Sequence, residues 1–263
     1  MSTWGVSVAM YQYFEINKSG HSISCKLYFN EIDDVRRVII FCHGFGGHKD
    51  NNAAMKLAKQ VLSRQKDCAV ITFNWPAHGD DPKKELHLED GSSYLDLLLS
   101  YVVQSFHTEN IYACATSFGG YLILKYIFEH GNPFRKIALR CPAVNMHDVL
   151  TRAIMSYDQL SQVRKGHHVS VGFDRKVTVG LSLLEELKTK DIQHWDYQKY
   201  ADDILIIHGT ADEIVPFNVS FDFAKNNLIE FIAVDDADHR FVDENKMELA
   251  IRQILDFFDS DLK

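Results

Sequence analysis

The sequence predicts an α/β fold, in which a mostly parallel central sheet of about eight strands carries helices on both faces. Two observations lead to this prediction. Short, continuous apolar runs such as 38–42 and 204–207 are typical of strands that are buried on both faces of a sheet. These runs alternate with longer segments of helical period, such as 51–63. We expect one domain spanning residues 1–263.

Each element can be placed along the chain from its own pattern. An antiparallel hairpin is expected first, with arms at 11–16 and 24–29 and a turn at Lys18-Ser19-Gly20. The helix at 92–106 is expected to begin with a cap on Ser92 or Ser93. The other strands are expected at 38–42, 68–75, 111–116, 136–141, 204–207 and 231–234, and the other helices at 51–63, 121–128 and 244–258.

One segment, approximately 144–200, interrupts the alternation of strands and helices. It is far longer than an ordinary connection between two strands. We expect helices within 146–163 and 179–190, separated by a short hairpin over 169–179 that turns near Asp174. The segment is polar and lacks the large apolar face expected of a lipase that works at interfaces.

Composition narrows the classes of partner. Lys and Arg number 28 against 36 Asp and Glu, so the formal net charge is −8. An acidic surface repels nucleic acid and anionic lipid, and we expect neither as a partner. The first ten residues show no secretory signal pattern, and no stretch is long and apolar enough to span a bilayer. A cytoplasmic location is the expectation that follows.

Five cysteines fall in or beside predicted strands: Cys25, Cys42, Cys68, Cys114 and Cys141. They contain no Cys-x-x-Cys pair, and their spacing does not suit a zinc site. We therefore expect buried, reduced thiols, no metal and no cofactor. A disulfide or a metal site is the alternative.

Ser117 is the strongest chemical signal in the chain. It lies between the apolar run 111–114 and the helical run 121–128, within Ala115-Thr116-Ser117-Phe118-Gly119-Gly120. A serine at a sharp turn from strand to helix is a nucleophile elbow, and small residues must flank it because strand and helix nearly touch. Gly119 meets this need, while Ala115 stands where the motif usually has glycine. The alternative is an ordinary turn.

A serine hydroxyl needs a base to take its proton, and the base needs a carboxylate to orient it. Asp212 follows the apolar run 204–207, and His239 lies between the last predicted strand and the closing helix. Earlier in the chain, the strand at 38–42 opens into the glycine-rich loop 43–47. We therefore assign Ser117 as nucleophile, His239 as base and Asp212 as acid.

Together these motifs resemble the α/β-hydrolase superfamily over essentially the whole chain, because the order Ser, Asp, His is the order of that fold. Within it, the loop 43–47 and Asp238-His239-Arg240-Phe241 are similar to small bacterial feruloyl (cinnamoyl) esterases and serine aminopeptidase-like hydrolases. The resemblance implies that 144–200 is a lid over the active site. It also implies an oxyanion hole formed by the backbone N–H groups of Phe45 and Phe118.

The other histidines have simpler interpretations. We expect His43 and His208, which precede glycines at strand ends, to be structural and to hydrogen-bond loop backbone. His78 is expected to shape its loop, and His167 and His168 to be solvated in the lid.

The acid has alternatives. Glu213 is adjacent to Asp212 and is a possible substitute for it. Asp235, Asp236 and Asp238 lie nearer His239 in sequence, where we expect a solvated acidic turn. A serine at the elbow, in place of an aspartate, argues against a dehalogenase or an epoxide hydrolase.

The expected activity is hydrolysis of small-molecule carboxylic esters with short or aromatic acyl groups through an acyl-enzyme. Phe45 and Phe118 are expected either to line an acyl pocket or to pack beneath the elbow. A thioesterase or aminopeptidase-like hydrolase with the same triad is the alternative, and a catalytically silent ligand receptor is a third possibility. Asp148, Tyr157, Phe173 and Asp174 are candidate substrate contacts in the lid. A homodimer is a possible assembly.

Overall fold

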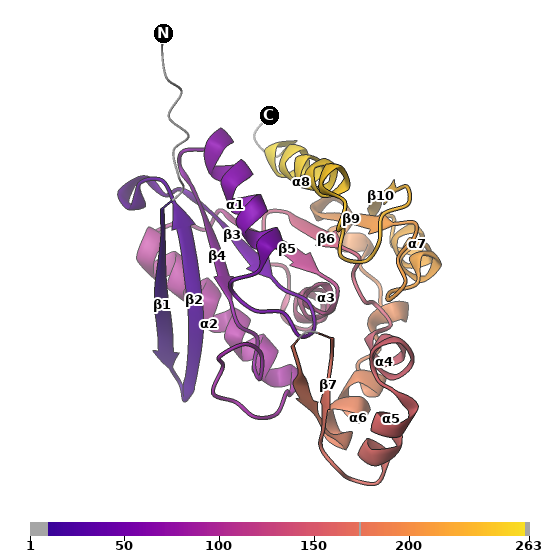
Figure 1. Cartoon of the computed structure of the whole chain (residues 1–263). Helices are drawn as coiled ribbons and strands as arrows, with labels where there is room; N and C mark the ends of the chain where they lie inside the picture. Colours follow the sequence, from indigo (N-terminus) through magenta and orange to yellow (C-terminus); the bar gives the residue numbers. More distant parts are fainter. Residues whose placement is uncertain (1–9, 174, 261–263) are drawn as a thin grey trace.

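A computed structural model describes residues 10–173 and 175–260. Its centre is an eight-stranded sheet in the order β1-β2-β4-β3-β5-β6-β9-β10, which is parallel from β4 to β10 and antiparallel at β1 and β2 (Figure 1). The predicted hairpin, sheet and strand number are confirmed. The strands are β1 (Met10–Lys18), β2 (His21–Phe29), β3 (Arg37–Cys42), β4 (Cys68–Phe73), β5 (Ile111–Thr116), β6 (Ile137–Arg140), β9 (Ile204–Gly209) and β10 (Glu230–Val234).

Helices cover both faces of the sheet, and alternating strand residues feed two cores. In β3, Ile39 and Phe41 point to the core beneath α1 (Asn52–Arg64) and α8 (Glu244–Asp259). The intervening residues of β3 point to the opposite core. That core is covered by α2 (Leu88–Phe106), α3 (Phe118–His130) and α7 (Phe217–Asn226). Burial on both faces explains why these strands are continuously apolar.

The predicted start of α2 is wrong. The helix begins at Leu88, and Ser92 lies buried inside it, where its hydroxyl accepts a hydrogen bond from Lys125 Nζ (3.2 Å). The first turn is held instead by Glu186, whose carboxylate accepts from the backbone N–H of Leu88 (2.8 Å) and contacts His87 Nδ1 (2.9 Å). A carboxylate at a helix N-terminus satisfies a free N–H and complements the helix dipole.

The segment between β6 and β9 has the helix, hairpin and helix order that its sequence predicts. A π-helical turn, η2, follows the short α4, and the N-terminus of α5 is closed by a capping box between Ser156 and Gln159. The expected turn at Asp174 lies outside the described residues. The elements are α4 (Met146–Asp148), η2 (Val149–Ile154), α5 (Tyr157–Arg164), β7 (Val169–Val171), β8 (Val177–Val179) and α6 (Leu181–Thr189).

The five cysteines are all buried and free, as their positions predict. Within the described part of the chain, no helix combines the length and the apolar character that crossing a membrane requires. The segment on which the expectation of no secretory signal depends, 1–10, lies outside the described residues except for Met10.

Candidate active site

Ser117 occupies the sharp turn between β5 and α3. Its backbone has φ 51° and ψ −117°, a strained conformation for a residue with a side chain. The helix passes so close to β3 that a Cβ atom on Gly119 would lie 2.5 Å from the Cys42 carbonyl oxygen. Glycine is therefore required at 119, whereas Ala115 fits into the buried core at the end of β5.

Hydrogen bonds on both sides of Ser117 hold this strained turn. The Ser117 N–H donates to the Arg140 carbonyl (3.0 Å), which ties the turn to the end of β6. The Ser117 carbonyl accepts from the N–H groups of Tyr121 (3.1 Å) and Ala143 (3.2 Å). Strain of this kind costs about 1–3 kcal/mol and persists only where the surroundings impose it.

His239 and Asp212, far apart in sequence, lie side by side. The distance from His239 Nδ1 to Asp212 Oδ2 is 2.7 Å. The other carboxylate oxygen accepts from the N–H groups of Ile214 (2.9 Å) and Val215 (2.8 Å). This pairing fixes the orientation of the imidazole and leaves Nε2 as the nitrogen available for proton transfer.

A second histidine supports the same carboxylate. His208 Nε2 lies 3.0 Å from Asp212 Oδ2 and 3.2 Å from the Val215 carbonyl oxygen. Burial alone would raise the pKa of Asp212, but hydrogen bonds from His208 and His239 outweigh it and hold this pKa well below its usual range. Asp212 is therefore an anion throughout the neutral pH range. The contact of His208 with loop backbone was predicted, but its contact with Asp212 was not.

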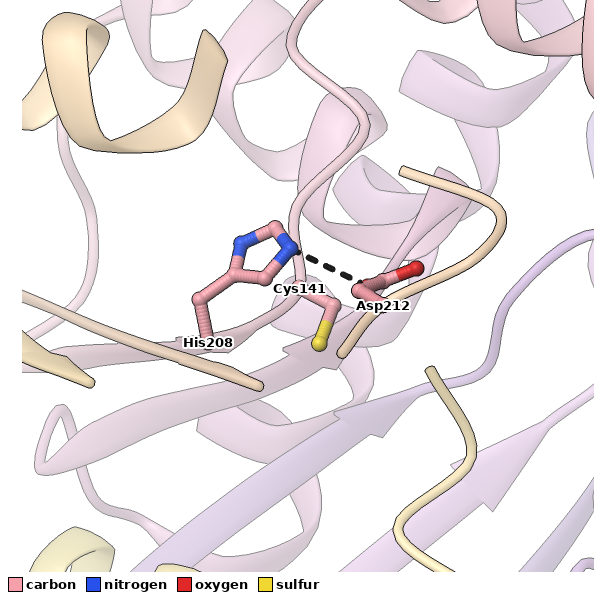
Figure 2. A group of neighbouring side chains, drawn as sticks. All are labelled: Cys141, His208 and Asp212. Atoms are coloured by element: carbon pink, nitrogen blue, oxygen red, sulfur yellow. Dashed lines mark ion pairs between the residues drawn. The ribbon is translucent and has the colours of Figure 1, made fainter. Parts of the chain in front are cut away.

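Cys141, His208 and Asp212 form a compact cluster (Figure 2), with one potential metal-ligand atom from each residue within 4.8 Å of the others. Burial raises the pKa of the Cys141 thiol well above its usual value, so the sulfur is protonated. Both oxygens of Asp212 already accept hydrogen bonds, one of them from His239. A cation here would compete with the His239 contact, so we assign the cluster to the support of Asp212.

Ser117 and His239 line one cavity of about 600 Å³. Its wall also includes Phe45 from the loop after β3, and Ile154 and Phe173 from the segment between β6 and β9. Among the described residues, Ser117 Oγ has no hydrogen-bond partner, so its hydroxyl is not bonded to His239 in this state. Hydrogen bonds between nucleophile and base are often long before substrate binds.

The two predicted oxyanion donors belong to Phe118, the residue after Ser117, and to Phe45, which lines the same cavity. Phe118 is the first residue of α3, so its N–H has no partner within the helix. Gly44, which precedes Phe45, comes close to the elbow, because a Cβ atom there would lie 3.2 Å from Ser117 Cβ. Neither N–H donates to another described residue. The Phe118 ring is fully buried and stacks on His78, whereas Phe45 faces the cavity.

The remaining histidines have other partners. His43 is buried, with Nδ1 2.8 Å from the Gly44 carbonyl oxygen and Nε2 accepting from Trp75 N–H (3.2 Å), and burial keeps its pKa well below the usual value. His78 contacts the Pro76 carbonyl oxygen, and burial lowers its pKa to about 4. Both are structural, as predicted. His167 and His168 are exposed, as predicted, and His168 lies 3.1 Å from Glu85 on the surface.

The alternative acids do not reach the imidazole. Glu213 accepts from the backbone N–H of His239 (3.3 Å), and Asp238 accepts from Val242 N–H (2.8 Å). Of the candidate substrate contacts between β6 and β9, Phe173 lines the cavity. Asp148 and Tyr157 are not among the lining residues, and Asp174 lies outside the described part of the chain.

Comparison with known proteins agrees with this architecture. A family model described as alpha/beta hydrolase fold matches residues 37–166. Est1E from Butyrivibrio proteoclasticus with bound ferulic acid superposes with a TM-score of 0.74 at 16% identity, covering 95% of this chain and 99% of that one. A soluble variant of monoglyceride lipase from Saccharomyces cerevisiae superposes with a TM-score of 0.74 at 14% identity, covering 98% of this chain and 97% of that one. No functionally curated protein matches the sequence. The chain is an α/β-hydrolase-fold protein.

Proposed function

We propose that the protein is a serine hydrolase that cleaves carboxylic esters through an acyl-enzyme. The observation that carries the proposal is the placement of Ser117, at a strained strand-to-helix turn, in the same cavity as an imidazole that Asp212 orients. Strained residues of this kind concentrate where chemistry requires an exact orientation.

The reaction follows from the contacts of each group. His239 Nε2 takes the hydroxyl proton of Ser117 as Oγ attacks the ester carbonyl carbon, and Asp212 stabilises the imidazolium that forms. The N–H groups of Phe45 and Phe118 are the proposed donors to the developing oxyanion. His239 then gives the proton to the leaving alcohol, and water repeats the sequence to release the acid and restore Ser117.

The proposed substrates are small esters with short or aromatic acyl groups. A cavity of about 600 Å³ falls in the size range of sites for small molecules, and Phe45 and Phe173 supply aromatic wall. The structure of Est1E with bound ferulic acid supports an aromatic acyl group by analogy. A thioester or an amino-acyl amide would pass through the same intermediates, so these remain the second candidate class. We propose no cofactor, metal, nucleic acid or membrane in this reaction, a cytoplasmic setting, and a homodimer as a possible assembly.

Covalent labelling with a fluorophosphonate tests the nucleophile. We expect labelling of the wild-type protein and of Ser63→Ala, a control at an exposed serine on α1, but not of Ser117→Ala. Acetyl, butyryl, octanoyl and feruloyl esters, a butyryl thioester and an alanyl anilide should be compared by kcat/KM. Faster turnover of the octanoyl ester than of the acetyl and feruloyl esters would contradict the acyl preference. Absence of labelling and of turnover would favour a silent receptor.

A further inference from the structure

The cavity beside Ser117 has a cationic wall that ester hydrolysis itself does not require. Asp50 is the one carboxylate among the described lining residues, and it is already paired with Lys26 (3.1 Å) and Lys49 (3.6 Å). The formal net charge of the chain is −8, so the excess of positive charge in this cavity is opposite in sign to the net charge of the protein. The cationic side chains that line the cavity are Arg140, Arg175, Arg240 and Lys56, of which Lys56 is paired with Glu244 (3.3 Å).

Arg140 is the member of this group nearest the nucleophile in the sheet. It ends β6 and pairs with Thr116 of β5, the residue before Ser117. Its carbonyl accepts the N–H of Ser117, and Thr116 and Arg140 both line the cavity with the nucleophile. The arginine is therefore fixed to the rigid strand ends that also hold Ser117.

The guanidinium of Arg140 has no carboxylate partner within the described protein. One Nη atom contacts Met247 Sδ at 3.1 Å, and the group lies over the Phe241 ring at 5.2 Å. Its Nε is buried and donates to no acceptor among the described residues. Burial lowers the pKa of Arg140, but a guanidinium is effectively always charged in proteins.

The described groups around Arg140 do not form an ion pair with it. The charges of Asp238 and Asp212 act to raise its pKa, but neither carboxylate is paired with the guanidinium. Burial raises the pKa of Cys114 to about 12 and that of Cys141 further, so both thiols are neutral. The Asp212 carboxylate is bonded to His208 and His239. A partly buried charge without a counter-ion is costly, and proteins keep such charges paired or use them to bind a ligand.

Two further features add positive potential at the same cavity. Arg175, after the hairpin strand β7, makes no ion pair with a described residue. The first residues of α1, Asn52 and Ala53, also line the cavity, so the positive end of that helix faces it.

From this arrangement we infer that the natural substrate carries a carboxylate, which pairs with Arg140 while the ester carbonyl lies at Ser117. The inference rests on the proposed function and names the class of ester within it. A planar guanidinium matches a planar carboxylate, and such charge-assisted hydrogen bonds are the strong ones. A neutral ester of the same size would leave the charge of Arg140 unpaired.

Matched pairs of esters test the inference in the wild-type protein. The acyl arm compares para-nitrophenyl hydrogen glutarate with para-nitrophenyl pentanoate, and the leaving-group arm compares para-acetoxybenzoate with para-acetoxybenzamide. Background hydrolysis is measured with Ser117→Ala. We expect the carboxylate-bearing ester to have the higher kcat/KM by about tenfold to a hundredfold in at least one arm.

Variants assign the preference to Arg140. Arg140→Met should lower turnover of the carboxylate-bearing ester and so reduce the anionic preference by at least about tenfold, while Arg140→Lys should keep part of the preference because it keeps the charge. Arg252→Met, at an exposed arginine on α8, should retain the full preference. Fluorophosphonate labelling of each variant shows whether its active site is folded.

Each possible failure has a different meaning. Labelling of Ser117 and ester hydrolysis without anionic preference in either arm would overturn this inference and leave the proposed function standing. Absence of both labelling and hydrolysis would overturn the two together. Competitive inhibition by inorganic phosphate, without inhibition by glutarate or benzoate, would overturn the choice of a carboxylate. An anionic preference that survives in Arg140→Met would overturn the role of Arg140.

Discussion

The strand ends around Asp212 and the segment between β6 and β9 differ in how firmly they hold the side chains that they bring to the active site. At the strand ends, Asp212 accepts from two backbone N–H groups and pairs with two imidazoles. In the other region, Phe173 and Arg175 reach the cavity from the exposed turn between β7 and β8, and Phe173 is 46% exposed. Reaction chemistry requires a fixed geometry, so we place it on the sheet and assign adjustable substrate contacts to the hairpin.

The largest effect expected from disturbing the strand ends comes from Asp212→Asn. The amide keeps the shape of the carboxylate but favours the wrong tautomer of His239, so kcat should fall by roughly 10⁴-fold. Asp235→Asn, in the exposed turn beside His239, should keep nearly full activity. Ester hydrolysis by the two purified variants measures the difference. Equal losses would mean that Asp212 is not the acid.

The same variant gives a pH prediction. The pKa of Asp212 is lowered on folding, so its ionised form stabilises the protein above the unfolded pKa of about 3.9, and this stabilisation is lost as the pH falls below that value. The stability difference between wild type and Asp212→Asn should therefore shrink on acidification from pH 7 to about pH 3. Urea unfolding at each pH measures it. A difference that stays constant would contradict the low pKa.

The steric limit at the elbow is tested by Gly119→Ala. The new Cβ would lie 2.5 Å from the Cys42 carbonyl oxygen and 2.6 Å from that of His43, so α3 must move and carry Ser117 with it. Overpacking of this kind costs about 1–3 kcal/mol of unfolding free energy. Gly91→Ala is the matched control inside α2, where the nearest atom is 3.5 Å away. It should stabilise the protein by about 0.5–1 kcal/mol. If urea unfolding gave the two variants a change in unfolding free energy of the same sign, the close approach of α3 to the end of β3 would be refuted.

The sequence predicted the strand ends well because their signals are local. Apolar strands followed by Ser117, Asp212 and His239 placed all three residues, and the structure brings Asp212 to His239. The start of α2 was missed because its N-terminal partner, Glu186, lies 98 residues away along the chain. No local pattern encodes such a contact. Helix α7 was not assigned either.

Two further features of the site could not be predicted from the sequence: the contact between His208 and Asp212, and the absence of a counter-ion for Arg140 within the described part of the chain. His208 and Asp212 are four residues apart, a spacing that gave no signal because the intervening residues form a turn and not a helix. Arg140 ends an otherwise apolar strand. It lacks a counter-ion among the described residues because α8 and the neighbouring strands pack groups other than carboxylates against its guanidinium, such as the Met247 sulfur. Such properties follow from tertiary packing and not from periodicity.

His208→Phe tests whether the second imidazole at Asp212 matters. The ring is fully buried near Phe217 and Phe231, so phenylalanine should fit while removing one donor to the carboxylate. A hydrogen bond to a charged group contributes about 1.5–3 kcal/mol, so we expect a drop of this size in unfolding free energy and about a tenfold lower kcat. His168→Phe, in the exposed segment, should change neither. Wild-type behaviour of His208→Phe would make the contact incidental.

The smallest expected effect concerns the hairpin. Phe173→Ala removes an aromatic wall of the cavity, and aromatic contacts contribute about 0.5–1.5 kcal/mol, so KM for a feruloyl ester should rise about fivefold. Turnover of an acetyl ester, which is too small to reach the ring, should not change. Tyr157→Ala is the matched control, because Tyr157 is an aromatic residue of the same segment that is 85% exposed and outside the cavity wall. Loss of acetyl ester turnover in Phe173→Ala would show that the hairpin takes part in the chemistry, and the division between a rigid reacting end and an adjustable binding end would then be wrong.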